Sequence, residues 1–172
     1  MMAFTARRKS IFFRTLVVVF LFLPLLTWAQ QPQVAIEGSY SAYTPLSPNP
    51  SPTWFNSGYL HLAISGYSTL TVSNGGIMTS SNTTIGGSSL SMYANFTGHG
   101  TVTVTGPGSN WSSSFWVRVG DKDIGIMNIT NGGVVSNSEG YIGYASGSSG
   151  TVTVAGAGSA WNNSSAVSQS LH

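Results

Sequence analysis

The sequence predicts an all-β chain that coils into a parallel β-helix of about four short rungs. The first observation is a near-identity fifty residues apart: TVTVTGPGSNW from Thr101 and TVTVAGAGSAW from Thr151. The second is an interleaved pair, LTVSNGG from Leu70 and MNITNGG from Met127. Self-similarity at a fixed period is typical of stacked units that bury their apolar faces only against their neighbours.

Residues 1–29 are predicted to be a signal peptide. Three basic residues (7–9) precede the apolar run Leu16–Leu26, and Thr27-Trp28-Ala29 is a small-x-small cleavage pattern before Gln30. This run is too short to span a bilayer core, which needs roughly 20 residues. An uncleaved signal-anchor is the alternative interpretation of the same segment.

Charge and cysteine usage exclude several classes of protein. The chain has six basic residues, but only Arg118 and Lys122 remain after residue 29, against four acidic residues, a formal charge of −2. The basic pI therefore belongs to the leader and gives no support for nucleic-acid binding. The absence of cysteine excludes a disulfide scaffold and a lipid anchor on cysteine.

Residues 30–53 are predicted to be a disordered Pro/Ser-rich linker. Proline recurs at positions 32, 45, 48, 50 and 52, and proline cannot donate a backbone hydrogen bond to a sheet. The segment from Gln30 to Ser51 is therefore expected to form no regular ladder. Tyr59–Leu62 is interpreted as the tail of a rung that begins in this linker.

Residues 54–165 are predicted to be the β-helix repeat region. Four alternating strands begin at Thr69, Thr101, Ile126 and Thr151, and extra residues near 87–98 lengthen the first interval. Each strand leads into a glycine turn, where Asn74 and Asn131 tolerate positive φ. Alternation places Leu, Val, Met and Ile inside the coil and most of the threonines outside. A β-sandwich is the alternative fold, but it predicts no repeats in phase.

Trp54, Trp111 and Trp161 are expected at equivalent positions of the coil. They alternate with rungs that carry NGG and no tryptophan, so the true repeat is two rungs. A tryptophan stripe can bind carbohydrate, but spacing in step with the corner turns favours structural packing.

These motifs in combination resemble the bacterial type V secretion/PEP-CTERM-associated repeat, over about Trp54 to Ser164. The resemblance rests on Trp111 to Gly120, MNITNGG, Tyr141-Ile-Gly143 and GSSGTVTVAGAGSAW ending at Trp161. It implies an exported autotransporter-passenger-like protein built as a right-handed β-helix. Residues 166–172 depart from the pattern and are predicted to be a broken or truncated repeat end, where Val167 and Gln169 correspond to Val117 and Val119.

The sequence offers no catalytic, cofactor-binding or metal-binding residues. Asp121 and Asp123 flank Lys122, but with no second acidic cluster they are predicted to form a solvated turn. His61 and His99 share no metal-ligand spacing with each other or with an acid. Because His61 aligns with Arg118, it is expected to face outward.

The predicted function is that of a non-enzymatic exported surface protein, adhesin-like or structural, at the bacterial cell surface, the outer membrane or outside the cell. Expected partners are host-surface, matrix or glycan ligands and, through the signal peptide, the secretion machinery; open strands also predict edge-to-edge self-association. The alternatives are a fragment of a carbohydrate-active β-helix enzyme and a secreted glycan-binding module that uses Trp116, Tyr93 or Tyr144.

Overall fold

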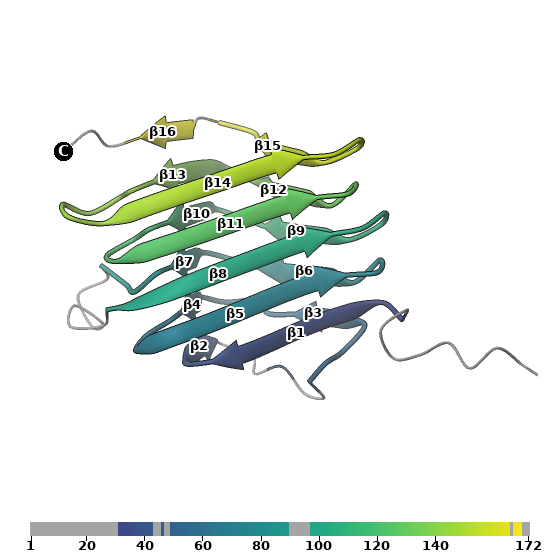
Figure 1. Ribbon diagram of the computed structural model, residues 1–172, viewed down its shortest axis with the longest axis horizontal. Helices are drawn as coiled ribbons and strands as arrows, with labels where there is room; N and C mark the ends of the chain where they lie inside the picture. Colours follow the sequence, from purple (N-terminus) through teal and green to yellow (C-terminus); the bar gives the residue numbers. More distant parts are fainter. Residues whose placement is uncertain (1–30, 43–45, 47–48, 90–96, 166, 170–172) are drawn as a thin grey trace, which may run out of the picture.

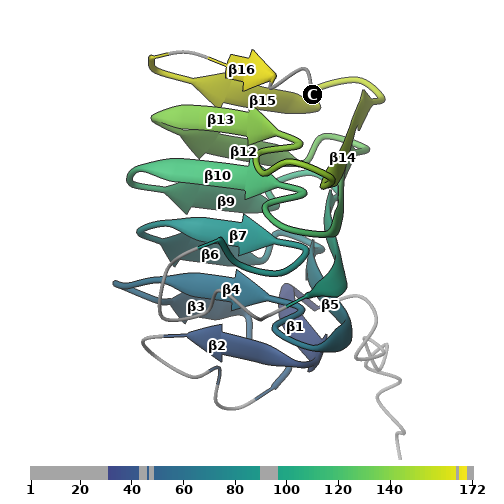
Figure 2. The same cartoon turned by 90° about the vertical axis from the view of Figure 1, so that its left-hand side faces the viewer.

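The computed structural model describes residues 31–42, 46, 49–89, 97–165 and 167–169, and this part of the chain is all-β with no helix. Three sheets stack their strands along one axis and form the sides of a coil (Figures 1 and 2). The predicted signal peptide lies outside the described residues. Within them, no helix is long and apolar enough to cross a bilayer.

Each complete rung contributes one strand to each of three sheets, which we name sheets A, B and C. Sheet A holds β1 (Gln33–Gly38), β5 (Gly66–Ser73), β8 (Gly98–Thr105), β11 (Ile124–Thr130) and β14 (Ser149–Ala155). Sheet C holds β3 (Thr53–Phe55), β6 (Ile77–Ser80), β9 (Asn110–Ser113), β12 (Val134–Asn137) and β15 (Ala160–Asn163). Sheet B holds β2 (Tyr40–Ala42), β4 (Leu60–Leu62), β7 (Thr83–Ile85), β10 (Trp116–Val119), β13 (Glu139–Ile142) and β16 (Val167–Gln169).

Successive rungs pair in parallel and in register, as the repeat predicts. In sheet A, Leu70 lies opposite Val102, which lies opposite Met127, and Met127 lies opposite Val152. The first three of these side chains are fully buried inside the coil. The parallel pairing contradicts the alternative of a β-sandwich, whose sheets are antiparallel.

Sheet C contains the tryptophan column, and its two-rung period is confirmed. The register aligns Trp54, Met78, Trp111, Val135 and Trp161. The first four are buried, and Trp161 is packed against the same core. These tryptophans therefore serve internal packing, as their spacing favours.

The glycine turns between sheets A and C explain why the repeat covers two rungs. The Ser109 hydroxyl donates to Thr105 O (2.7 Å) and accepts from the Gly75 N–H of the preceding rung (3.0 Å). Ser159 repeats this arrangement with Ala155 O and the Gly132 N–H. Each GxGS turn is thus hydrogen-bonded to the NGG turn of the preceding rung. In these NGG turns, Asn74 and Asn131 adopt φ of 53° and 52°.

The prediction of a disordered linker at residues 30–53 is wrong for residues 33–42 and for β3, which begins at Thr53. Strand β1 pairs antiparallel with β5, and β2 pairs antiparallel with β4. Val34 and Ile36 alternate with polar neighbours and are buried opposite Val72 and Leu70. The prolines precede β1 or follow β2, so none interrupts either ladder. The segment therefore caps the first rung.

The opposite end of the coil has no such cap among the described residues. Strand β16 extends sheet B in parallel, with Val167 opposite Gly140 and Gln169 opposite Ile142, so the described backbone of the predicted broken repeat end continues the coil. Val154 is 46% exposed, whereas its counterparts Val104 and Ile129 in the inner rungs are fully buried. The last rung of sheet A thus exposes part of the core column.

Candidate functional site

The corner that joins sheet C to sheet B alternates aromatic and small polar residues from rung to rung. Backbone hydrogen bonds from Ser81 N to Gly58 O and from Phe115 N to Ser81 O, both 2.9 Å, align these three residues along the coil. The next column aligns Tyr59, Asn82 and Trp116, because Leu60 pairs with Thr83 and Thr83 with Val117. A rung with small side chains therefore lies between two rungs with rings.

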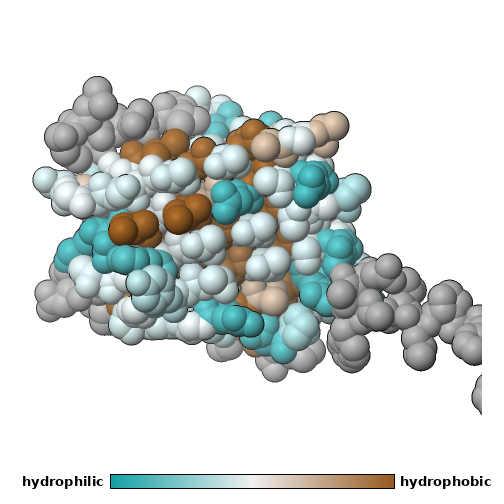
Figure 3. Space-filling view, viewed as in Figure 1, coloured by the Kyte–Doolittle hydropathy of each residue, from teal (hydrophilic) through white to brown (hydrophobic). Residues whose placement is uncertain are grey.

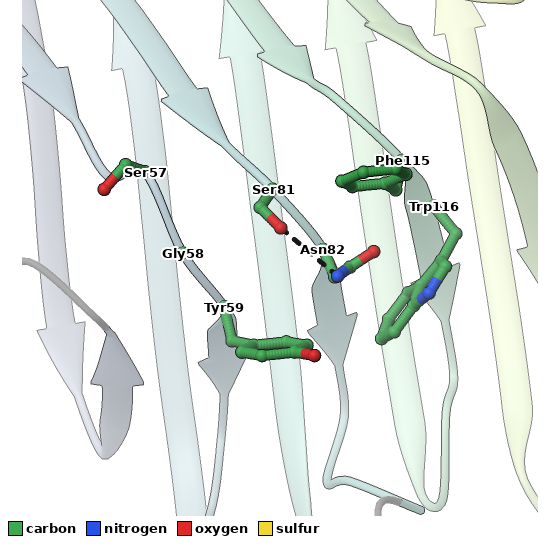
Figure 4. Close-up of a pocket in the computed structure, with 7 residues that line it drawn as sticks. All are labelled: Ser57, Gly58, Tyr59, Ser81, Asn82, Phe115 and Trp116. Atoms are coloured by element: carbon green, nitrogen blue, oxygen red, sulfur yellow. Dashed lines mark hydrogen bonds between the residues drawn. The ribbon is translucent and has the colours of Figure 1, made fainter.

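This alternation leaves a groove of about 620 Å³ on the outer surface. Figure 4 shows Tyr59 on one side of Asn82, with Phe115 and Trp116 on the other. The remaining lining residues are Ser57, Gly58 and Ser81, and none of the lining residues is charged. Tyr59 is 51% exposed and Phe115 is 59% exposed, so the rings present free faces to solvent.

Side-chain hydrogen bonds fix the backbone around the groove. The Asn56 amide, which is fully buried, donates to Tyr59 O at 3.0 Å and holds the turn that carries this ring. The Ser113 hydroxyl donates to Ser81 O at 2.8 Å and fixes the groove floor. The Asn82 Nδ2 donates to Ser81 Oγ at 3.2 Å, whereas its Oδ1 is buried without a hydrogen-bond partner.

One wall of the groove is supported by a cation. The Arg118 guanidinium carbon lies 4.2 Å from the Trp116 ring centroid and 3.5 Å from that of Tyr144, so it makes cation–π contacts with both rings. Arg118 Nη1 is also 3.3 Å from Asp121 Oδ1. Stacking and an ion pair together restrict the arginine and, through it, the indole of Trp116.

The prediction of a solvated Asp-Lys-Asp turn is wrong for Asp121, which is fully buried. Its carboxylate accepts hydrogen bonds from the Ser89 N–H, from the Ser89 hydroxyl at 3.0 Å and from Arg118. Ser89 follows β7, and its hydrogen bonds place it against the carboxylate. Lys122 and Asp123 are half-buried, and Asp123 Oδ1 lies 3.8 Å from His99 Nε2.

His61 shares the outward column of Arg118, as expected, but its side chain is buried. Its side chain is 1% exposed, stacks on the Tyr59 ring at 5.9 Å between centroids, and places Nδ1 2.9 Å from Thr84 Oγ1. Burial lowers the pKa of His61 from 6.5 to about 4, and the negative charge of Asp121 opposes this shift. The imidazole is therefore neutral at neutral pH.

The acidic residues of the repeat region each have a polar partner and form no metal site in the described part of the chain. Glu139 accepts a hydrogen bond from the Tyr141 hydroxyl at 2.7 Å, which raises the pKa of that phenol. No group of three or more His, Cys, Asp or Glu side chains among the described residues could hold a metal ion. The geometry favours binding through rings, hydroxyls and an amide over acid–base chemistry.

The structure describes two of the three aromatic residues predicted for glycan binding, and both contact Arg118. Trp116 lines the groove, Tyr144 stacks on Arg118 behind it, and Tyr93 lies outside the described residues. Sequence reasoning missed Tyr59, Phe115 and Asn82. A usable signal was present, because Tyr59 and Trp116 each stand five residues after a column tryptophan, Trp54 and Trp111.

No protein-family description, curated protein or solved structure matches this chain. The resemblance to the type V secretion/PEP-CTERM-associated repeat therefore stays a prediction.

Proposed function

We propose that this chain is a non-enzymatic segment of an exported bacterial surface protein, adhesin-like or structural, and that its coil is a right-handed β-helix of the autotransporter-passenger kind. The signal-peptide pattern of residues 1–29 supports export. The coil supplies a stiff stalk, because each rung adds about 4.8 Å of height with fully paired backbone. Its role is then to display an outer surface to a host, a matrix or a glycan.

The observation that carries the proposal is the chemistry of the outer surface. The exposed face of sheet A is largely of intermediate hydropathy (Figure 3), since a polar column lies outside the coil: Thr71, Thr103, Asn128 and Thr153. The neighbouring column of Thr69, Thr101 and Thr151 is interrupted by Ile126. The corner between sheets C and B adds an uncharged groove walled by three rings. Hydroxyls and rings without paired free carboxylates suit contact with a surface better than bond cleavage.

The two alternative functions differ in their support. A carbohydrate-active enzyme needs two carboxylates flanking one bond, and Asp121 is already enclosed by Arg118 and Ser89. A glycan-binding module is favoured by the groove itself, and this function is compatible with an adhesin. The groove therefore refines the first proposal.

Export is tested by expressing the full chain with a C-terminal tag in a Gram-negative host. The expected product is found outside the cytoplasm and begins at Gln30. A Val18→Arg variant, which places a charge in the apolar run, should remain in the cytoplasm at full length. Wild-type protein that stays uncleaved in the cytoplasm would overturn the proposal of export.

Adhesion and catalysis are separated with the exported product. Polysaccharide-coated and matrix-protein-coated surfaces are tested for retention of the protein, and the same polysaccharides in solution for release of new reducing ends. We expect retention on at least one surface and no release above a heat-denatured control. Release of reducing ends that depends on Asp121 or Asp123 would favour the enzyme instead.

A further inference from the structure

We propose that the groove between Tyr59 and the Phe115–Trp116 pair is a binding site for neutral pyranose units of a glycan. The inference rests on the proposed surface function and names the class of ligand that this function requires. Three properties of the groove lead to it: its ring-lined walls, its unpaired polar floor and its lack of charge.

The walls fit a ligand that has flat apolar faces. Tyr59 and Phe115 are more than half exposed, although aromatic rings gain free energy by covering their faces. The volume of about 620 Å³ falls within the range of roughly 300–1,000 Å³ that is usual for small-ligand sites. A pyranose presents C–H-lined faces to such rings and directs its hydroxyls around its edge.

The floor requires a ligand that donates hydrogen bonds. Asn82 is 9% exposed, and its Oδ1 is the one buried oxygen among the described side chains that has no hydrogen-bond partner. An unpaired buried acceptor is costly, so a ligand hydroxyl that reaches it gains the bond that the free protein lacks. The oxygen is buried in the free protein, so a ligand hydroxyl reaches it only when the Asn82 side chain rearranges.

The same acceptor argues against the other polymer that aromatic grooves commonly bind. Proline-rich peptides dock onto rings in the extended polyproline conformation, but proline has no N–H to donate. An uninterrupted run of prolines would leave Asn82 Oδ1 unpaired. The uncharged lining likewise disfavours acidic glycans, because the nearby cation, Arg118, is already stacked and paired with Asp121.

The site is also pre-organised. Trp116 is held by stacking on Arg118, and the backbone of Tyr59 is held by the Asn56 amide. Rings that are fixed before binding lose little conformational entropy when the ligand arrives, which raises affinity for a given contact area. The rung between them carries the short side chains of Ser81 and Asn82, which keep the groove open.

The test uses the tagged protein, purified from whichever cell fraction contains it, on an array of neutral and anionic oligosaccharides and a decameric polyproline peptide. Calorimetry with the best neutral glycan follows. We expect a neutral glycan to bind. Tyr59→Ala, which removes one wall, and Ser81→Phe, which fills the slot with a ring, should each weaken binding by about tenfold or more, the scale of one lost aromatic contact. The matched control is Tyr67→Ala, because Tyr67 is 77% exposed but lies on sheet A.

Asn82→Leu separates a ligand-binding role from a structural one. If Oδ1 accepts from the ligand, this variant loses about tenfold in affinity while its thermal midpoint is unchanged or higher, because an unpaired buried oxygen has been removed. Circular dichroism checks that each variant keeps the β fold.

Four outcomes would overturn the site: no binding of any neutral glycan, binding of polyproline or of anionic glycans alone, equal loss in Tyr67→Ala, or full binding by Ser81→Phe. If Ser81→Phe still binds the surfaces that retain the wild type, the site is wrong and the adhesin proposal stands. If the chain is not exported but the groove variants lose glycan binding, the binding site stands and the proposal of an exported adhesin is wrong.

Discussion

Truncation of Trp111 should be the most damaging change in the tryptophan column. The side chain is fully buried between Met78 and Val135, and its Nε1 donates to Ser80 Oγ at 3.0 Å. Replacing a buried tryptophan by alanine costs about 3–5 kcal/mol, and the lost hydrogen bond adds about 1 kcal/mol. We therefore expect Trp111→Ala to lose about 4–6 kcal/mol of unfolding free energy, a large part of the roughly 5–15 kcal/mol typical of a domain.

Trp161 provides the matched comparison, because it occupies the same column one repeat later. It also makes an indole hydrogen bond, to Asn137 Oδ1 at 2.6 Å, but it is only half-buried and no described rung covers its far side. We expect Trp161→Ala to cost about half as much. Urea unfolding of the exported protein, followed by far-ultraviolet circular dichroism, measures both losses. Equal losses, or less than about 1 kcal/mol for Trp111→Ala, would refute the reasoning.

Three further predictions concern the charged cluster, the buried histidine and the open edge. Asp121→Ala leaves the Arg118 guanidinium, whose side chain is 12% exposed, without its carboxylate partner. This variant should cost about 3–5 kcal/mol in urea unfolding, whereas Asp123→Ala should cost less than about 1 kcal/mol. Similar losses would contradict a stabilising role for the Arg118–Asp121 pair. The pKa of His61 is lowered from 6.5 to about 4 in the folded state. The unfolded chain therefore binds this proton more tightly, and stability falls as the pH falls from about 6.5 toward 4, by up to about 2 kcal/mol between about pH 7 and pH 5. His61→Gln should weaken this dependence of the unfolding free energy on pH. If the dependence is unchanged in the variant, it comes from another titratable group. Strand β14 has a free edge among the described strands. Thr153→Lys should therefore reduce concentration-dependent association in sedimentation velocity, while Thr71→Lys, in the same column of an inner rung, should not. Equal effects would indicate association through another surface.

The repeat pattern was sufficient to predict the register of the coil. Apolar alternation in Leu70, Val102, Met127 and Val152 identifies equivalent positions, and equivalent positions in a solenoid become neighbours one rung apart. The burial of Trp111 followed from its spacing in the same way. The cap was missed because its prolines dominated the interpretation, although Val34 and Ile36 alternate as a strand should.

The candidate site was only partly predictable, because burial on the outer surface depends on what lies over it. Asp121 has the local sequence of a solvated turn, and only the fold brings Ser89 over its carboxylate. Trp116 was a predicted contact residue, but nothing in its own segment indicated that Tyr59 and Asn82 would complete a groove. These residues are 57 and 34 positions earlier in the chain.

By itself the sequence determined the periodic properties of this protein: the strands, the inward and outward faces, the turns and the two-rung repeat. These properties depend on residues that recur at fixed intervals, so aligning the copies identifies the equivalent positions in each rung. Only the tertiary structure decided where the periodicity breaks and what the breaks create. A Cβ on Gly125 would lie 2.5 Å from the backbone oxygen of Ile85 in an earlier rung. The Tyr59–Trp116 groove exists because the rung between its walls has small side chains. Both features are distances between rungs, and a chain specifies such distances only once it has coiled.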